Sequence, residues 1–203
     1  MTRLKIFAAL ILILLWSRGM AIEEPDYRVE KTTDVYEIRA YEPYIVAQTL
    51  VTGDASDAGN EGFRILAAYI FGKNQSQGSI AMTAPVAQSA AKIEMTAPVA
   101  MRAGPKGYWV QFAMPHQWTL ATLPKPLDER VQLIQMPARR VAVVRYSGFW
   151  SESRYEENLA RLRAALVADG LVTEGDPVWA RYDPPWIPWF LRRNEIWLQL
   201  EPG

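Results

Sequence analysis

The residues best suited to chemistry lie in a proline-interrupted segment near the end of the chain. From Asp183 to Arg193 the sequence reads DPPWIPWFLRR, and its three prolines exclude regular structure. It holds apolar side chains followed by two basic ones: Trp186, Ile187, Trp189, Phe190, Leu191, Arg192 and Arg193. Rings stack on flat ligands, and guanidinium groups bind carboxylates. The segment is therefore a candidate wall of a pocket for a flat acidic ligand. Packing on its own sheet, the commoner use, and contact with a membrane surface are the alternatives.

Catalytic or metal-binding side chains are scarce. There is no cysteine, which excludes disulfides, thiolate metal sites and cysteine nucleophiles, and His116 is the single histidine. It follows Met114-Pro115 at the expected end of a strand, where we expect a solvated histidine because no second group that would orient it as a base is evident. Without a C-x-x-C-H context, it is also an unspecific candidate for a haem ligand. An enzyme is not predicted.

Two near-copies, residues 80–87 and 93–100, carry Met-Thr-Ala-Pro-Val. We interpret both as extended structural segments, because methionine fills irregular gaps and proline belongs at strand ends or edges. The functional alternative is copper binding by Met82, Met95 and Met101, but neither a histidine nor a cysteine accompanies these methionines. No metal site is predicted.

Charge and composition limit the class of binding partner and the cellular location. The chain is 50% hydrophobic and 22% charged, with a formal net charge of +0, so we expect a packed core and no nucleic-acid partner. Arg3 and Lys5 precede the apolar run of residues 6–16, and small residues at Gly19 and Ala21 complete a secretory signal over residues 1–21. The run is shorter than the ~20 residues that span a bilayer, which disfavours an uncleaved anchor and a stable membrane span. We expect a periplasmic or secreted protein, with net charge −3 after Ala21.

The first half predicts strands at residues 27–30, 35–39 and 44–52, with a tight turn at Glu42-Pro43. A helix should follow, capped by Asp54 or Ser56 and stopped at Gly72. Its apolar face carries Phe63, Leu66, Ala67 and Ile70. Residues 108–114 predict another strand, and the prolines in residues 123–128 predict a loop.

The second half repeats this order. Residues 131–148 can be laid on residues 36–53 without a gap, and a second helix carries Tyr155, Leu159, Leu162 and Leu166, with a cap at Ser151 or Ser153 and a stop at Gly170. Strands at residues 178–182 and 194–200 close the chain. We therefore predict an α+β fold: a distorted antiparallel β-barrel from a duplicated strand-strand-helix-strand unit, with two flanking helices. It forms one domain over residues 22–203, with pseudo-repeats at about 27–101 and 108–200.

Several motifs in order resemble the SOUL haem-binding protein family. They are Tyr36-Glu37-Ile38-Arg39-x-Tyr41, Gly62-Phe63-x-x-Leu66-x-x-Tyr69-Ile70-x-Gly72-x-Asn74, Ile80-x-Met82-Thr83-x-Pro85-Val86, Phe112-x-Met114-Pro115, Tyr182-Asp183-Pro184-Pro185 and Arg192-Arg193-Asn194-Glu195-x-Trp197-Leu198. The resemblance covers nearly the whole chain after residue 27.

The resemblance implies a duplicated barrel that binds haem or another tetrapyrrole non-covalently, with no known catalysis. It places the ligand in an apolar groove between the first helix and the loop before the last strand. The implied binding residues are Phe63, Leu66, Ala67, Ile70, Trp186, Trp189, Arg192 and Arg193, with Arg192 or Arg193 meeting a propionate. Neither segment holds a histidine, so the resemblance implies no axial ligand. It implies no specific protein partner either.

We expect an exported tetrapyrrole buffer or carrier. Two alternatives remain open. One is a ligand- or protein-binding module of gyrase-inhibitor-like architecture without a haem function, and the other is a small hydrolase in the same groove.

Overall fold

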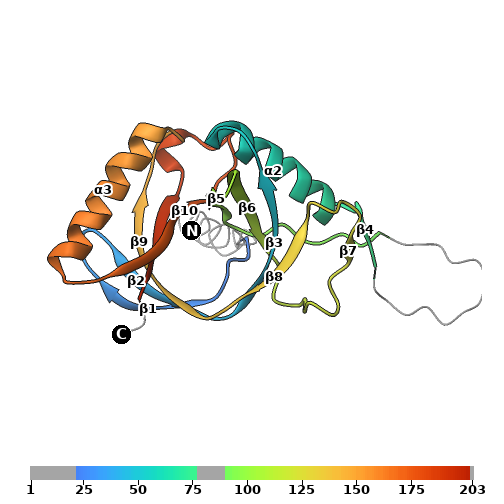
Figure 1. Ribbon diagram of the computed structural model, residues 1–203, viewed down its shortest axis with the longest axis horizontal. Coiled ribbons are helices and arrows are strands. Elements are labelled where there is room, and N and C mark those ends of the chain that lie inside the picture. The colour runs from blue at the N-terminus through green and yellow to red at the C-terminus, as the bar shows by residue number, and fades with distance from the viewer. Residues whose placement is uncertain (1–21, 77–89, 202–203) are drawn as a thin grey trace, which may run out of the picture.

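The computed structural model describes residues 22–76 and 90–201 (Figure 1). The predicted signal segment and the first Met-Thr-Ala-Pro-Val copy lie outside these residues. No helix in the described ranges has the length and apolar character needed to cross a bilayer.

A curled antiparallel sheet dominates the fold (Figure 1). Its strands lie in the order β1-β2-β9-β11-β10-β5-β6-β3-β8. Their bounds along the chain are β1 Tyr27–Thr32, β2 Glu37–Tyr41, β3 Tyr44–Val51, β5 Val99–Gly104, β6 Gly107–Ala113, β8 Gln132–Met136, β9 Arg139–Tyr146, β10 Thr173–Arg181 and β11 Asn194–Leu200. With the two helices on this sheet, the predicted α+β fold class is confirmed.

The two halves exchange their first strands. β2 pairs with β9 of the second half, and β8 pairs with β3 of the first half. The sheet order is consequently symmetrical about the β10–β5 pair. Glu42 and Pro43 therefore form the predicted short connection between two consecutive strands, but those strands do not pair with each other. Alternation of apolar residues specifies which face of a strand is buried but not which strand becomes its partner.

The two helices begin close together and diverge over the sheet (Figure 1). α2 (Ala55–Ile70) lies against β3 and β6, and Asp54 caps it by accepting from the backbone N–H groups of Ser56 and Asp57, both at 2.9 Å. Gly72 follows at φ 121°, as expected of a glycine stop. α3 (Glu152–Ala168) lies against β9 and β11 and begins after Ser151, whose side chain forms no capping bond.

The sheet separates the apolar core into clusters on its two faces. In β9, Ala142 and Val144 face α3 with Leu162, whereas Val141 and Val143 point to the inside of the curl. The inner cluster also holds Trp197 and Tyr41. α2 covers a third cluster that includes Leu66, Tyr69 and Ile70.

Two predicted irregular segments differ from the structure, and in a third the proline stands at a strand end as predicted. Lys125–Pro126, predicted as part of a loop, forms the short strand β7 with β4 (Asn74–Gln75). Trp189–Leu191 forms one 3-10 turn, η1, despite the nearby prolines, because Pro188 stands before the turn and not within it. The second Met-Thr-Ala-Pro-Val copy enters a strand only at Val99, directly after Pro98, and β5 then runs on to Gly104.

Candidate functional site

The segment between β10 and β11 folds back on the connection between β9 and α3. The backbone N–H of Gly148 donates to the carbonyl of Trp189 at 3.0 Å. The ring of Trp189 stacks on that of Phe149, with centroids 5.3 Å apart and planes 21° apart, and it meets Phe190 edge-on at 5.5 Å. These contacts place the predicted aromatic segment beside Phe149, which sequence reasoning did not include.

The apolar side chains of this region are exposed. Trp186 is 80% exposed and Trp189 is 45% exposed. We call the set the aromatic patch: Phe149, Trp186, Trp189, Phe190 and Leu191, all of which are exposed. Of the uses considered for the segment, burial in the protein's own core does not apply to these side chains. The ring of Trp189 contacts those of Phe149 and Phe190, and an exposed apolar patch of this kind marks a site for a ligand, partner or membrane.

Arg192 shapes the loop that carries the patch. Its Nε donates to the carbonyl of Ile187 at 2.8 Å, and Nη2 donates to that of Pro185 at 2.5 Å. Its guanidinium carbon lies 4.8 Å from the ring centroid of Trp150. Among the described residues, no carboxylate pairs with Arg192. The loop is thus rigidified by a cation that no carboxylate of the described residues neutralises.

Arg193 has a different role. Its Nε lies 2.9 Å from Glu195 and its Nη1 lies 2.7 Å from Glu24, while its guanidinium stacks on the ring of Tyr182 at 3.6 Å. Two carboxylates already neutralise this arginine, so the structure favours Arg192 over Arg193 as the partner of a ligand carboxylate.

Glu195 is the centre of a buried charge network beneath the loop. Arg39 donates to both of its oxygens, at 2.9 and 3.1 Å, and Tyr182 and Trp197 donate to one of them at 2.7 and 2.9 Å. Burial by itself would raise the pKa of Glu195, but the hydrogen bonds and charge of Arg39, together with Arg193, outweigh it and lower the pKa. The base of the loop is therefore held by an ionised group with every oxygen occupied.

The predicted helix wall is divided between core and surface. Leu66 and Ile70 are 0% and 1% exposed and fill the cluster under α2, because the helix turns that face onto β3 and β6. Phe63 is 39% exposed and meets Phe112 edge-on at 5.4 Å, and Ala67 is half-buried. In the described conformation, only Phe63 and Ala67 of this set present surface to a ligand. Contact of any of them with a tetrapyrrole remains a prediction.

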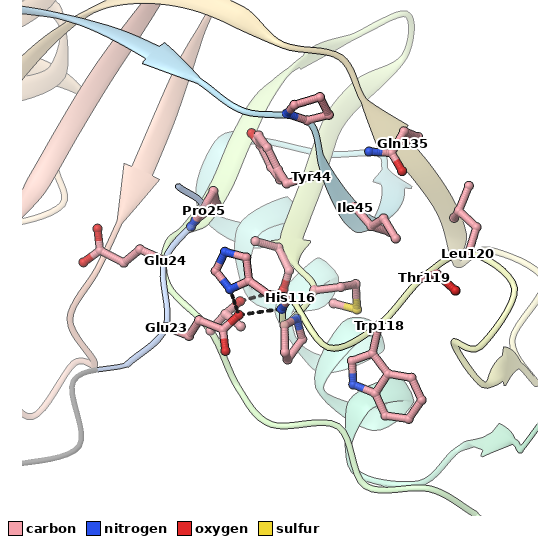
Figure 2. A pocket seen from close by; sticks show the side chains of 15 residues that line it. Glu23, Glu24, Pro25, Tyr44, Ile45, His116, Trp118, Thr119, Leu120 and Gln135 are labelled. Atoms are coloured by element: carbon pink, nitrogen blue, oxygen red, sulfur yellow. Dashed lines mark hydrogen bonds and ion pairs between the residues drawn. The ribbon is translucent and has the colours of Figure 1, made fainter. Parts of the chain in front are cut away.

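A separate cavity of about 250 Å³ contains His116 (Figure 2). The ring Nδ1 contacts Glu23, whose carboxylate also accepts from the backbone N–H of His116 at 2.6 Å, and the ring Nε2 lies 2.9 Å from Asp26. Sequence reasoning found no group that orients this histidine. The group is Glu23, which lies 93 residues away in the chain and so leaves no local signal.

The surroundings of His116 suit a structural clamp more than a catalyst. Both ring nitrogens face carboxylate oxygens, so neither is free to take a proton from a nucleophile. Nor do residues 22–76 and 90–201 contain three or more His, Cys, Asp or Glu residues grouped to hold a metal ion. The histidine instead ties the segment before β1 to the end of β6.

Comparison with known proteins identifies the family of this chain. The family model for the SOUL heme-binding protein matches residues 22–199. The chain is 30% identical to heme-binding protein 2 of Homo sapiens over 189 residues, covering 89% of this chain and 87% of that protein. It is 30% identical to heme-binding protein 1 of Mus musculus over 165 residues, covering 80% and 83%.

Among solved structures, the EcmrR C-terminal domain superposes with a TM-score of 0.58 at 11% identity, covering 87% of this chain and 99% of that one. At that identity the likeness concerns the fold alone.

Proposed function

Because this chain belongs to the SOUL haem-binding protein family, we propose that it binds haem or another tetrapyrrole non-covalently and acts outside the cytoplasm as a buffer or carrier. The observation that carries the proposal is the aromatic patch, exposed beside an arginine that lacks a carboxylate partner among the described residues.

The residues present fit a flat apolar ring with acidic groups. Trp186, Trp189 and Phe190 offer ring surface, and Arg192 offers a cation at its edge. When bound, the tetrapyrrole supplies the planar apolar surface and the propionate charges. Burial contributes about 25 cal/mol per Å² of apolar area, whereas an exposed ion pair is usually worth ~0 to 1 kcal/mol. Ring contact should therefore dominate the affinity.

A binding role also agrees with the chemistry of the described residues. The imidazole of His116 has both nitrogens occupied, and it lies in a different cavity from the aromatic patch. No histidine belongs to the patch itself, so the proposed recognition is of the ring and its carboxylates and needs no axial histidine.

Export is the second part of the proposal. Residues directly after the predicted cleavage site take part in the fold: Glu24 pairs with Arg193, and the carbonyl of Glu23 accepts from the N–H of Ala97 at 2.9 Å. Cleavage after Ala21 would leave these contacts whole. Mass spectrometry of the protein exported by its host should find Ile22 at the N-terminus, and an intact Met1 in the membrane fraction would contradict export.

A titration of the mature protein tests the binding function. Haemin and iron-free protoporphyrin IX should both bind with saturable absorbance changes and similar affinity, since the ring is recognised and not the metal. Trp186→Ser and Trp189→Ser should weaken both ligands, whereas Phe71→Ser, at an exposed aromatic residue at the end of α2, should not. Absence of saturable binding for either ligand would favour a module without a haem function.

A further inference from the structure

A small cleft opens beside the aromatic patch, where α3 begins against the centre of the sheet. It is lined by Tyr146, Trp150, Ser151, Trp179, Ala180, Arg181, Asn194 and Glu195. Its volume of about 10 Å³ suits roughly one water molecule or one small polar group. A tetrapyrrole ring cannot enter it, but one oxygen of a carboxylate, which is about the size of a water molecule, can.

Arg181 is the cation of this cleft. Its guanidinium carbon lies 4.7 Å from the ring centroid of Trp150 and 5.8 Å from that of Trp179. On the α2 side, Nη1 lies 3.8 Å from where a Cβ would stand on Gly59, which places the guanidinium against the helix backbone. The guanidinium is thus enclosed between two rings and a helix backbone.

No carboxylate neutralises this cation within residues 22–76 and 90–201. Glu195 is the one acidic residue lining the cleft, and its oxygens are bound by Arg39, Arg193, Tyr182 and Trp197. Burial accordingly lowers the pKa of Arg181, which shows that its charge is poorly compensated. An arginine nevertheless stays protonated at neutral pH, so the cleft carries an unmatched positive charge.

Further donors surround the same place. The indole Nε1 of Trp179 is buried and has no partner among the described residues. Arg192 stacks on Trp150, the ring that Arg181 also contacts, so a second cation lies close to the cleft although it does not line it. Trp150 is itself fixed, because its Nε1 donates to Asn194 at 2.8 Å and Asn194 donates to the carbonyl of Gly148. The platform between the two arginines is therefore preorganised.

We propose that this cleft is a carboxylate-binding subsite in which Arg181 is the main anchor and Trp179 Nε1 a second donor, while the rings of the same ligand lie on the aromatic patch. The inference rests on the proposed function in taking the ligand to be a tetrapyrrole. It adds a specificity: the ligand must carry a free carboxylate on a flexible arm, as a propionate does.

The test compares haemin with haemin dimethyl ester, which keeps the ring and the iron but lacks the carboxylates. Arg181→Met should weaken haemin binding at least tenfold and leave the weaker binding of the ester unchanged. Trp179→Phe, which removes the buried donor and keeps a smaller aromatic ring, should weaken haemin in the same direction. Arg161→Met, at an exposed arginine of α3, is the matched control and should bind as the parent does. Circular dichroism and melting confirm that each variant is folded.

Equal binding of haemin and its ester, or an unchanged haemin affinity in folded Arg181→Met and Trp179→Phe, would overturn the subsite while leaving tetrapyrrole binding intact. If haemin does not bind at all, the proposed function fails, and 3-(1-naphthyl)propionate, whose carboxylate sits on a flexible arm, then decides the subsite by tryptophan fluorescence. Saturable binding of this probe that is lost in Arg181→Met but retained in Arg161→Met would uphold a carboxylate site. No binding of the probe would refute it.

Discussion

At the scale of single residues, Glu195 shows how this protein keeps a charge in its interior. The side chain is 1% exposed, and two arginines, a tyrosine and an indole satisfy its oxygens. Removing one member of such a set leaves the remaining charges buried and uncompensated, which costs more than the intact set contributes. The loop that carries the aromatic patch joins β11 at this network, so its geometry depends on it.

Glu195→Gln should therefore lower the free energy of unfolding by about 3–5 kcal/mol, since Arg39 and Arg193 would lose their carboxylate partner. Urea unfolding followed by circular dichroism measures the change. Glu174→Gln is the control, because that glutamate is exposed and its side chain accepts a hydrogen bond at the surface. A loss below about 1 kcal/mol for Glu195→Gln would mean that the network is not the energetic centre of the fold.

His116→Ala should leave haem binding within about a tenfold change, roughly 1.4 kcal/mol, because the imidazole is held by Glu23 and Asp26 away from the patch. Absorbance in the Soret region during a haemin titration gives the affinity. Loss of the Soret change in the folded variant would instead make His116 an iron ligand.

At the scale of elements, α2 contains two glycines with opposite surroundings. A Cβ on Gly62 would meet Val110 Cγ2 of β6 at 2.5 Å, whereas one on Gly59 would have Met101 Sδ at 3.7 Å as its nearest neighbour. Gly62 thus allows the helix to approach the sheet closely, while Gly59 borders the more open space near Arg181.

Alanine at these two positions should have effects of opposite sign. Gly59→Ala should raise the free energy of unfolding by up to about 1 kcal/mol through helix propensity. Gly62→Ala should lower it by about 1–3 kcal/mol, because overpacking against β6 exceeds that gain. Thermal and urea unfolding of both variants measure the pair, and stabilisation by Gly62→Ala would show that α2 can move off the sheet at little cost.

The burial of α2 also limits what substitutions can report about the site. Leu66→Asp, a substitution at one of the implied binding residues, places a charge at a side chain that is 0% exposed. We expect it to unfold the protein, since an unpaired buried charge is among the most destabilising changes. Phe63, at 39% exposure, tests the helix side of the site without this complication.

At the scale of the whole molecule, acid should destabilise the fold. Hydrogen bonds from Lys31 and Tyr36 lower the pKa of Asp169, and a hydrogen bond from Arg130 lowers that of Asp128, in the same direction as Glu195. A carboxyl whose pKa is lowered by folding stabilises the protein above its unfolded pKa, and this stability is lost as pH falls through the folded value. The melting temperature should therefore decrease as the pH is lowered below about 4.5. Glu195→Gln should reduce this dependence, and a flat acid profile for the parent would contradict it.

Alkali should act through the tyrosines. Burial raises the pKa of Tyr155 to about 12, and burial likewise raises the pKa values of Tyr69 and Tyr41. Groups whose pKa is raised by folding stabilise it fully below the unfolded pKa near 10 and lose that contribution as pH rises through the folded value. Melting temperatures measured from pH 8 to 12 should thus decline above about pH 10. A melting temperature that stays constant to pH 12 would show that these hydroxyls ionise without unfolding.

Local patterns in the sequence determined the elements and the kind of fold. Alternation identified most strands, the 3.6-residue period identified both helices, and Asp54 and Gly72 mark the ends of α2 where capping chemistry requires them. The aromatic residues and arginines before β11 were evident as well, because their composition is unusual wherever the chain places them. Such features depend on neighbours in sequence, which is why they are visible without coordinates.

Tertiary structure alone decided which of these residues are available to a ligand. Leu66 and Phe63 lie on one predicted helix face, yet one is core and the other is surface, because β3 and β6 meet only part of that face. Arg193 was a predicted ligand-binding cation and Arg181 was not considered, but Glu195 and Glu24 neutralise the first, while the second is enclosed by Trp150 and Trp179 and has no carboxylate partner among the described residues. Charge compensation depends on contacts between segments far apart in the chain, and those contacts exist only once the strands have exchanged between the two halves.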